Sequence, residues 1–308
     1  MRKALITGSR GFVGPYLRRE LEAAGCAVVG LDVRGGEGTI AADLLDAGRL
    51  RALVEQERPD AIFHLAGQAN VARSWEIPQK TVELNVIGAV NLLEAVRAAA
   101  PGCRVLLVGS SDQYGNLGEA GRRVDETLAV RPQTPYAVSK CAQEEMARVY
   151  GRAYGLDICM TRSFNHAGPG QARGFLISDF ASGIAAVERG EADCLRVGNL
   201  EARRDFTHVR DIVRAYRLIA EHGRAGEVYN VGSGAAHSAR EILDRLCAMA
   251  RCRIPVEQDP ARLRPSDTPV VCCDHAKLTR DTGWEPRETL ETVLRETLEF
   301  YRSEQSAG

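Results

Sequence analysis

A glycine-rich turn that joins an apolar strand to a helix restricts the fold of this chain more than any other feature. Ala4–Ile6 predicts a buried strand, and Gly8, Gly11 and Gly14 follow it before a helix predicted at Tyr16–Ala24. The first glycine permits a tight turn, the second lets a pyrophosphate approach the backbone, and the third lets helix and strand pack closely. Amides at the helix N-terminus favour phosphate charge. The turn therefore predicts a dinucleotide site, although a purely structural turn could have the same spacing.

Strands and helices alternate along the first half of the chain, which favours an α/β fold with a Rossmann-like, doubly wound parallel sheet. Further strands are predicted at Ala27–Leu31, Ala61–Leu65, Arg104–Val108 and Leu156–Thr161, and helices at Leu50–Gln56, Thr81–Ala99 and Tyr136–Tyr154. After about residue 164 the pattern loosens into loops and short helices, and one later strand, Glu227–Val231, is expected to return to the sheet. The later part is expected to form a smaller C-terminal substrate-binding lobe over the carboxyl ends of the strands.

The charge balance argues against nucleic acid or a membrane as a partner. The 308 residues include 40 basic and 41 acidic side chains, for a formal net charge of −1, so local clusters must hold any anionic ligand. No run of about 18 apolar residues predicts a transmembrane helix, and the N-terminus reads as a strand rather than a signal peptide. The nine cysteines, such as the adjacent Cys272 and Cys273, have no metal-site spacing. We therefore expect a cytoplasmic protein with reduced thiols and no metal.

Asp32 ends the second predicted strand, 18 residues beyond Gly14, where an acidic side chain would bind the adenosine ribose 2′-hydroxyl of the cofactor. A strand-end turn aspartate is the other explanation. Arg10 and Arg34 could instead pair with a 2′-phosphate, which a carboxylate alone would repel. The cofactor is therefore expected to be NAD(H), with NADP(H) left open.

The segment after the third predicted strand is expected to reach the other end of the cofactor. Leu65, Ala66 and Gly67 would approach the ribose and nicotinamide side. His64, just before them, is expected to be a strand-end histidine whose polar atoms are satisfied. In the glycine turn itself, Phe12 and Val13 complete the expected cofactor contacts.

Tyr136 and Lys140 stand four residues apart on a predicted helix and so share one face. A nearby ammonium favours the phenolate, which lets a tyrosine exchange protons near neutral pH. Ser110 and Ser111 follow the fourth predicted strand, and a serine there can donate a hydrogen bond to a carbonyl oxygen as charge develops on it. Hydride chemistry needs a cofactor, a proton carrier and a hydroxyl donor. This chain offers all three, although a serine pair can also serve only as a turn.

Along its whole length the chain resembles the extended short-chain dehydrogenase/reductases. The matching segments are Thr7–Gly14, His64–Gly67, Ser110–Gly115, Tyr136–Lys140 and Asn85 in the long helix. Three later segments are similar to those of GDP-4-keto-6-deoxy-D-mannose reductases, namely Arg162–Gln171, Gly198–Asp211 and Arg264–Asp267. His208 departs from that pattern, because related sequences often carry an acidic residue there. We expect this change to alter local hydrogen bonding without removing activity.

The resemblance implies a role for each matching residue. Tyr136 would be the acid, with Lys140 as its electrostatic partner. Ser110 would bind the substrate carbonyl, with Ser111 as the alternative. Asp43 and Leu44 fall where similar proteins hold the adenine amino group of the cofactor.

The same resemblance implies a site for a nucleotide-linked sugar. Asn165, Arg204 and Arg264 would hold its diphosphate, and Asp267 would meet the nucleoside ribose. An arginine fork can pair two oxygens of one phosphate, although either arginine could be a solvated surface charge. We predict a dinucleotide-binding domain of residues 1–163 with about 205–235, and a sugar-nucleotide-binding lobe of about 164–204 with 236–308.

The expected reaction is NAD(P)H-dependent reduction of the 4-keto group of GDP-4-keto-6-deoxy-D-mannose to GDP-D-rhamnose or a close relative. The alternatives are a GDP-mannose 4,6-dehydratase and a nucleotide-sugar 4-epimerase, and, in another class, a non-catalytic dinucleotide sensor on the same fold. Asp112 stands where those dehydratases carry a glutamate, and it is expected to contact the sugar instead. Similar proteins commonly dimerise through helices equivalent to Thr81–Ala99 and Tyr136–Tyr154, so a homodimer is expected.

Overall fold

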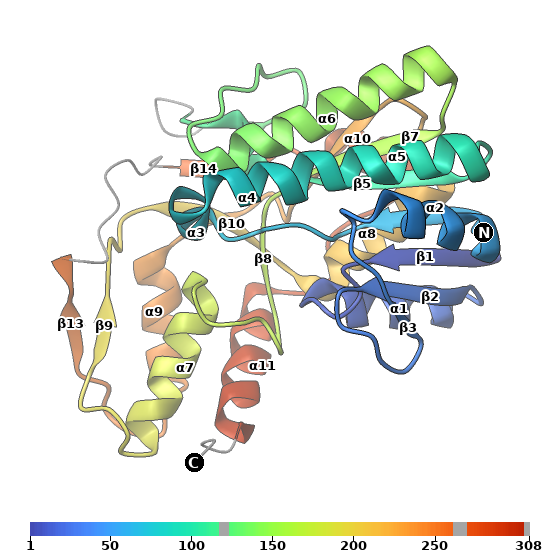
Figure 1. Ribbon diagram of the computed structural model, residues 1–308. Helices are drawn as coiled ribbons and strands as arrows, with labels where there is room; N and C mark the ends of the chain where they lie inside the picture. Colours follow the sequence, from blue (N-terminus) through green and yellow to red (C-terminus); the bar gives the residue numbers. More distant parts are fainter. Residues whose placement is uncertain (117–122, 261–269, 305–308) are drawn as a thin grey trace.

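The structure is a computed structural model that describes residues 1–116, 123–260 and 270–304. Its larger part is a parallel sheet of seven strands in the order β11-β7-β5-β4-β1-β2-β3 (Figure 1). The strands are β1 (Lys3–Thr7), β2 (Ala27–Asp32), β3 (Thr39–Ala41), β4 (Ala61–His64), β5 (Arg104–Ser110), β7 (Ile158–Ser163) and β11 (Val228–Val231). The strand order reverses between β1 and β4, and a doubly wound sheet opens its ligand crevice at such a reversal. The predicted fold class is confirmed.

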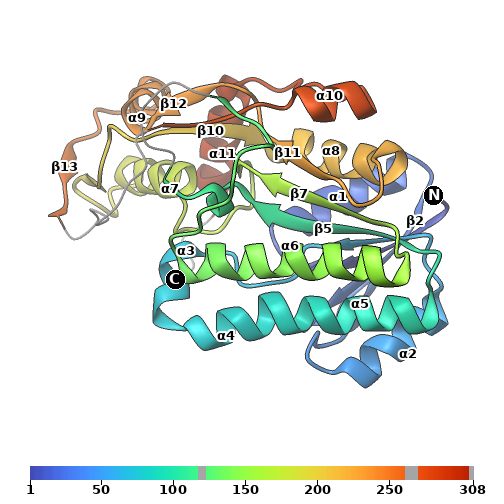
Figure 2. The same ribbon diagram turned by 90° about the horizontal axis from the view of Figure 1, so that it is seen from above.

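Helices cover both faces of this sheet, which gives three layers (Figure 2). One face carries α2 (Ala47–Glu57), α5 (Gly88–Ala99) and α6 (Pro135–Tyr154), and the other carries α1 (Val13–Ala23), α8 (Val209–His222) and α10 (Ala276–Thr282). Leu5 of β1 packs into the apolar core beneath α2, α5 and α6. Its neighbours Ala4 and Ile6 pack into the core on the opposite face, beneath α1, α8 and α10. A parallel strand buried on both faces needs apolar side chains throughout, which explains the continuous apolar run in its sequence.

The long helix predicted at Thr81–Ala99 is interrupted by a π-helical turn. The chain runs from α4 (Pro78–Val82) through the turn Glu83–Ile87 into α5. Within the turn, Asn85 accepts a hydrogen bond from the Gln68 amide at 2.7 Å and donates one to the Ser139 hydroxyl of α6 at 2.9 Å. The turn therefore ties the loop after β4 to α6.

The part after residue 164 is more regular than its sequence pattern indicated. Helices α7 (Leu176–Glu188), α9 (Ala239–Ala248) and α11 (Leu290–Ser303) enclose an apolar core of their own. A second sheet contains β6 (Arg123–Val124), β8 (Asn165–Ala167), β10 (Arg203–His208), β12 (Ala236–Ser238) and β14 (Val270–Cys273), while β9 (Leu195–Val197) pairs with β13 (Val256–Gln258). Strands of two to six residues are too short for alternation to be recognised in sequence.

One later strand lies where it was predicted, and one later segment lies elsewhere. β11 pairs with β7 at the edge of the large sheet, as expected for Glu227–Val231. Leu278 and Trp284 pack beneath α8 in the core of the larger domain, although the predicted boundaries assign them to the smaller lobe. Among the residues described here, no helix is long and apolar enough to cross a membrane.

Candidate active site

The glycine turn after β1 lies at the reversal of strand order and has room for a diphosphate. Gly8 has a φ of +68°, and a Cβ on it would lie 2.8 Å from the backbone of Ala66. A Cβ on Gly14 would overlap the carbonyl group of Ser9, so α1 packs directly on the turn. A Cβ on Gly11 would meet only the Gly8 carbonyl, at 3.2 Å, so the outer side of Gly11 is open. These residues fit a dinucleotide cofactor, because each glycine performs the task expected of it.

Helix α1 begins at Val13, so its first amides face this turn. The ring of Phe12 stacks on that of His166, with centroids 6.1 Å apart and an interplanar angle of 7°. The Tyr16 hydroxyl donates a hydrogen bond to the Pro169 carbonyl at 2.8 Å. The loop after β8 is thus held against the cofactor turn. Sequence reasoning missed this contact, because its two sides are far apart in the chain.

Asp32 and the two competing arginines meet at the end of β2. The Asp32 carboxylate accepts hydrogen bonds from the backbone amides of Arg10 and Arg34, both at 3.1 Å. The Arg10 guanidinium donates to the Gly35 carbonyl. That of Arg34 lies 4.0 Å from the carboxylate, and its side chain is 73% exposed. This geometry suits either a ribose hydroxyl on Asp32 or a 2′-phosphate on the arginines.

The segment Leu65–Gly67 lies over the carboxyl end of β1, where the nicotinamide side was expected. The Leu65 amide donates to the Thr7 carbonyl at 3.2 Å, and the Ala66 amide donates to the Thr7 hydroxyl at 3.3 Å. A Cβ on Gly67 would come within 2.6 Å of the Asn85 side-chain oxygen. The backbone at this position therefore has room for glycine only.

Asp43 and Leu44 follow β3 beside the end of β2, since the Ala42 amide donates to the Asp32 carbonyl at 2.9 Å. The Asp43 carboxylate accepts the amide hydrogen of Leu45 at 3.0 Å. The Leu44 carbonyl accepts a hydrogen bond from the Asn91 side chain at 2.9 Å, which anchors the segment on α5.

His64 is only half satisfied. Its Nδ1 forms a hydrogen bond with the Thr7 hydroxyl at 2.8 Å, whereas its buried Nε2 has no partner within the described part of the chain. Burial and the neighbouring charge of Lys140 lower the pKa of His64 to about 3. The ring is therefore neutral at physiological pH, and the expectation that its polar atoms are satisfied holds for one nitrogen only.

Tyr136 lies in the first turn of α6, near the end of β5. The helix begins at Pro135, a residue suited to that position, and the Thr134 hydroxyl caps it. The phenol lies beside the side chain of Ser110, which lowers its pKa slightly against the effect of burial. Burial raises the pKa of Tyr136 above its usual value, and the charge of Asp112 raises it further. The phenol therefore keeps its proton at neutral pH and can act as a proton donor.

The net shift of the Tyr136 pKa is upward, opposite to the lowering expected beside Lys140, because burial of the phenol is the largest contribution. The Lys140 ammonium donates to the Val108 carbonyl at 2.8 Å and to the Gln143 side chain at 3.0 Å. Its own burial lowers the pKa of Lys140 to about 8. Lys140 is thus fixed against the end of β5 and still carries a proton in most molecules at neutral pH.

The serine pair divides between two elements. Ser110 is the last residue of β5, and Ser111 opens the short 3-10 helix Ser111–Tyr114. The Ser110 hydroxyl accepts a hydrogen bond from the Asp112 amide at 3.2 Å and lies beside the phenol of Tyr136. The geometry favours Ser110 over Ser111 as the hydroxyl beside the proton donor, and it places Asp112 close enough to act on the phenol.

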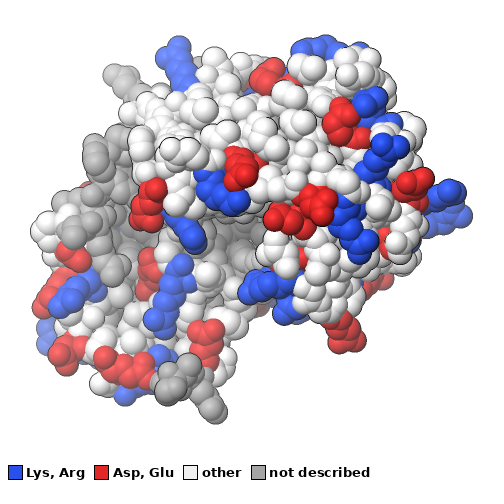
Figure 3. Space-filling view, in the orientation of Figure 1, with Lys and Arg blue, Asp and Glu red and all other residues white. Residues whose placement is uncertain are grey.

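Two of the predicted substrate residues, Asn165 and Arg204, lie on the strands β8 and β10 between the large sheet and the smaller lobe (Figure 1). Asn165 of β8 pairs in register with Phe206 of β10, two residues beyond Arg204. The Arg204 guanidinium donates to the Arg203 carbonyl at 2.9 Å. Arg264 and Asp267 lie outside the described residues. A hollow with Lys, Arg, Asp and Glu side chains at its rim separates the larger domain from this lobe (Figure 3).

His208, which departs from the reductase pattern, takes part in two hydrogen bonds. Its Nδ1 accepts the amide hydrogen of Arg210 at 3.0 Å and so caps α8. Its other ring nitrogen forms a hydrogen bond with Glu296 of α11 at 3.2 Å. Burial and the charge of Arg210 lower the pKa of His208, and the neutral ring joins the two helices.

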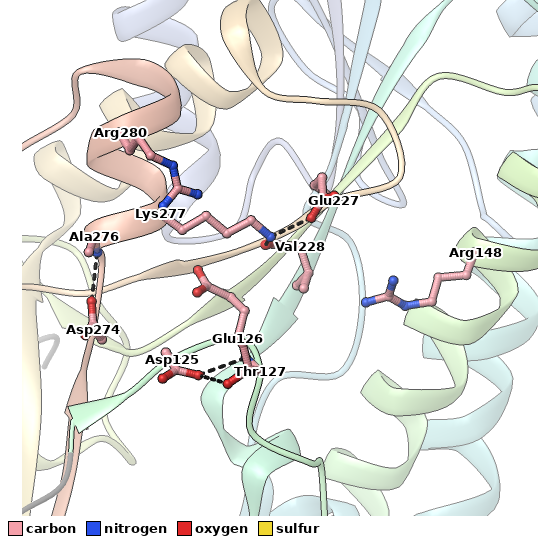
Figure 4. Close-up of a pocket in the computed structure, with 10 residues that line it drawn as sticks. All are labelled: Asp125, Glu126, Thr127, Arg148, Glu227, Val228, Asp274, Ala276, Lys277 and Arg280. Atoms are coloured by element: carbon pink, nitrogen blue, oxygen red, sulfur yellow. Dashed lines mark hydrogen bonds and ion pairs between the residues drawn. The ribbon is translucent and has the colours of Figure 1, made fainter.

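A second hollow, of about 550 Å³, lies between α6, β11 and α10 (Figure 4). Lys277 donates to Glu227 at 2.6 Å and to the Val228 carbonyl at 2.7 Å. Arg148 pairs with Glu144 at 2.9 Å. Because its cations are already paired and it lies apart from Tyr136, we do not assign it to the reaction.

Comparisons with known proteins show which proteins this chain resembles. Residues 5–297 match the protein family described as GDP-mannose 4,6 dehydratase. The chain is 38% identical over 302 residues to the GDP-6-deoxy-D-mannose reductase of Pseudomonas aeruginosa. The alignment covers 98% of this chain and 97% of that protein. It is also similar to the structure of RMD from Pseudomonas aeruginosa complexed with NADPH (TM-score 0.89, 36% identity, 98% and 99% covered). The UDP-glucose 4-epimerase of Thermus thermophilus in complex with NAD is a further structural relative (TM-score 0.88, 29% identity, 98% and 100% covered).

The fold, the glycine turn and the Ser110–Tyr136–Lys140 arrangement define an NAD(P)-dependent oxidoreductase of nucleotide sugars, of the extended short-chain dehydrogenase/reductase kind. Within that class, the chain belongs to the GDP-mannose 4,6-dehydratase family.

Proposed function

We propose that the protein reduces the 4-keto group of GDP-4-keto-6-deoxy-D-mannose to give GDP-D-rhamnose or a close relative, with NADH or NADPH. The observation that carries this proposal is the position of Tyr136 in the first turn of α6, beside Ser110 at the carboxyl end of β5. A protonated phenol there can donate a proton to a new alkoxide oxygen. The choice of substrate rests on the full-length similarity to a GDP-6-deoxy-D-mannose reductase.

We assign separate residues of this chain to cofactor binding, to binding of the carbonyl oxygen and to proton transfer. The turn Gly8–Val13 would hold the cofactor diphosphate, and a bound reduced nicotinamide would supply the hydride. Ser110 would donate a hydrogen bond to the C4 carbonyl oxygen, and Tyr136 would pass its proton to that oxygen as the ketone becomes an alcohol. The Lys140 ammonium would then stabilise the phenolate left behind.

Binding of the sugar nucleotide is proposed for the side of the hollow formed by the smaller lobe. Asn165 and Arg204, on adjoining strands, would contact the diphosphate, together with Arg264. Asp267 would bind the nucleoside ribose, and Asp112 would contact the sugar. The homodimer proposal is supported by apolar side chains that α4, the π-turn and α6 expose, which are Val82, Ile87, Val138 and Val149. The free thiols of all nine cysteines suit a reducing cytoplasm.

A GDP-mannose 4,6-dehydratase remains the second candidate, because Asp112 is close enough to raise the pKa of Tyr136. Elimination of water needs a base that reaches the C5 proton, within about 2.6–3.2 Å between heavy atoms. Asp112 is one methylene shorter than the glutamate that those dehydratases carry. We therefore favour a polar contact to the sugar over a role as base.

Absorbance of the reduced nicotinamide tests the proposal. With GDP-4-keto-6-deoxy-mannose, each turnover should consume one NADH or NADPH. GDP-mannose with oxidised cofactor should give little or no keto product. Rapid formation of a 4-keto-6-deoxy product from GDP-mannose would instead identify a dehydratase, and inactivity with both sugars would refute this choice of nucleotide sugar.

A further inference from the structure

The turn that carries Ser110 is held by a buried side chain that the reaction itself does not use. Gln113 lies in the short helix Ser111–Tyr114, is fully buried and points back beneath the end of β5. Its side-chain oxygen accepts the backbone amide hydrogen of Ser110 at 2.9 Å. A Cβ on Gly109 would lie 2.3 Å from the Thr161 carbonyl oxygen and 2.5 Å from the Gln113 side-chain oxygen, so both groups pack directly against this glycine.

The other end of the same amide reaches the helix that carries the proton donor. The Gln113 side-chain nitrogen donates to the Glu144 carboxylate at 2.7 Å. Glu144 lies on α6, one turn beyond Lys140 and two turns beyond Tyr136, so all three face the end of β5. One glutamine therefore connects the backbone of Ser110 with the helix of Tyr136.

Glu144 is in turn a fixed point. Arg162 of β7 donates to both of its oxygens, at 3.0 and 2.7 Å, and Arg148 adds a third contact at 2.9 Å. Burial alone would raise the pKa of Glu144, but the hydrogen bonds and charge of Arg162 hold it below its usual value. Glu144 is therefore ionised, accepts hydrogen bonds only, and requires a donor at position 113.

We propose that Gln113 is a positioning residue for catalysis: its side-chain amide, bonded to the Glu144 carboxylate that Arg162 holds in place, sets where the Ser110 hydroxyl stands relative to the Tyr136 phenol. The proposal rests on the proposed roles of Ser110 and Tyr136. A displacement of about 1 Å in such a pair can lower turnover about 10²-fold without weakening substrate binding. Among the common side chains of this length, glutamine uniquely offers an acceptor to Ser110 and a donor to a carboxylate at once.

Two single variants test the amide. Gln113→Met keeps the length of the side chain and removes both hydrogen bonds. Gln113→Glu keeps the acceptor for Ser110 but turns a second carboxylate toward Glu144. In both we expect kcat to fall about 10–100-fold, with the KM values for cofactor and sugar nucleotide within about threefold of the wild type. Cofactor binding stoichiometry gives the folded fraction, so that a loss of folded protein is not counted as a loss of kcat.

The variant that removes both hydrogen bonds and keeps the length of the side chain decides the outcome. A kcat within about twofold of the wild type in folded Gln113→Met would overturn the proposal.

Ser110→Ala, measured in the same assay, separates this proposal from the proposed function. If Ser110→Ala lowers kcat while Gln113→Met does not, only the positioning role is wrong. If Ser110→Ala leaves kcat unchanged, the assigned carbonyl ligand is wrong, and the role of Gln113 is wrong with it.

Discussion

The charged side chains at the catalytic edge of the large sheet are buried, whereas many of those in the smaller lobe are exposed. At the catalytic edge, Lys140, Glu144 and Arg162 are each no more than 6% exposed, and every one has close polar partners. In the lobe, pairs such as Arg240–Glu201 are more than half exposed on both sides, although Arg302–Glu188 is a buried exception. Buried polar groups fix geometry, because a lost partner leaves a desolvated charge. Exposed ones stay available to a ligand and contribute little stability.

The largest effect is expected from the proton donor itself. Tyr136→Phe removes the hydroxyl and keeps the packing of the ring, so kcat should fall about 10²–10⁴-fold while the KM for the sugar nucleotide stays nearly constant. Steady-state kinetics with reduced cofactor measure both. Near-normal turnover would contradict the assignment of the catalytic edge.

The contrast in burial predicts a contrast in stability. Arg162→Met leaves the buried Glu144 carboxylate without its main partner, and the free energy of unfolding should fall by about 3–5 kcal/mol. Arg240→Met, the control, removes an exposed pair with Glu201 and should change it by less than about 1 kcal/mol. Urea unfolding of both variants gives the two values. Equal losses would show that burial does not separate the two regions.

Charges of the lobe should matter for binding instead. Arg204→Ala should weaken the binding of GDP by about 1.5–3 kcal/mol, the contribution of a charge-assisted hydrogen bond. Isothermal titration with GDP measures the change, and the midpoint of urea unfolding should barely move. Unchanged GDP affinity would place the diphosphate on other residues.

A pH profile sharpens the picture of the buried edge. Burial lowers the pKa of Lys140 to about 8, so the ammonium is present below that pH and is lost as the pH rises through it. Stabilisation of the phenolate of Tyr136 should be lost with the ammonium, and kcat should decline by up to about tenfold per pH unit above about 8. Constant kcat up to about pH 10 would show that the charge of Lys140 is not used.

The smallest effect is expected at the cofactor ribose. If Asp32 accepts hydrogen bonds from two ribose hydroxyls, NADH should be preferred over NADPH, and Asp32→Ala should narrow that preference by about tenfold or less. The ratio of kcat/KM for the two cofactors is the measurement. A strong wild-type preference for NADPH would mean that Arg34 or Arg10, beside that carboxylate, decides instead.

Much of the larger domain could be predicted from sequence because its signals are local. The spacing of Gly8, Gly11 and Gly14 and the apolar runs of the buried strands report contacts within one strand–turn–helix unit. The helical spacing of Tyr136 and Lys140 likewise fixed a shared face before any tertiary contact was known. The strands of the lobe were missed because they are very short.

What only the tertiary structure decided concerns groups brought together from distant parts of the chain. The Phe12–His166 stack, the raised pKa of Tyr136 and the path from Ser110 through Gln113 to Glu144 and Arg162 join separate elements of the fold. Burial, which reversed the expected pKa shift of Tyr136, is a property of the packed molecule. The sequence by itself determined which chemical groups are present and which share a strand end or helix face; packing decided which of them touch, and hence which are charged.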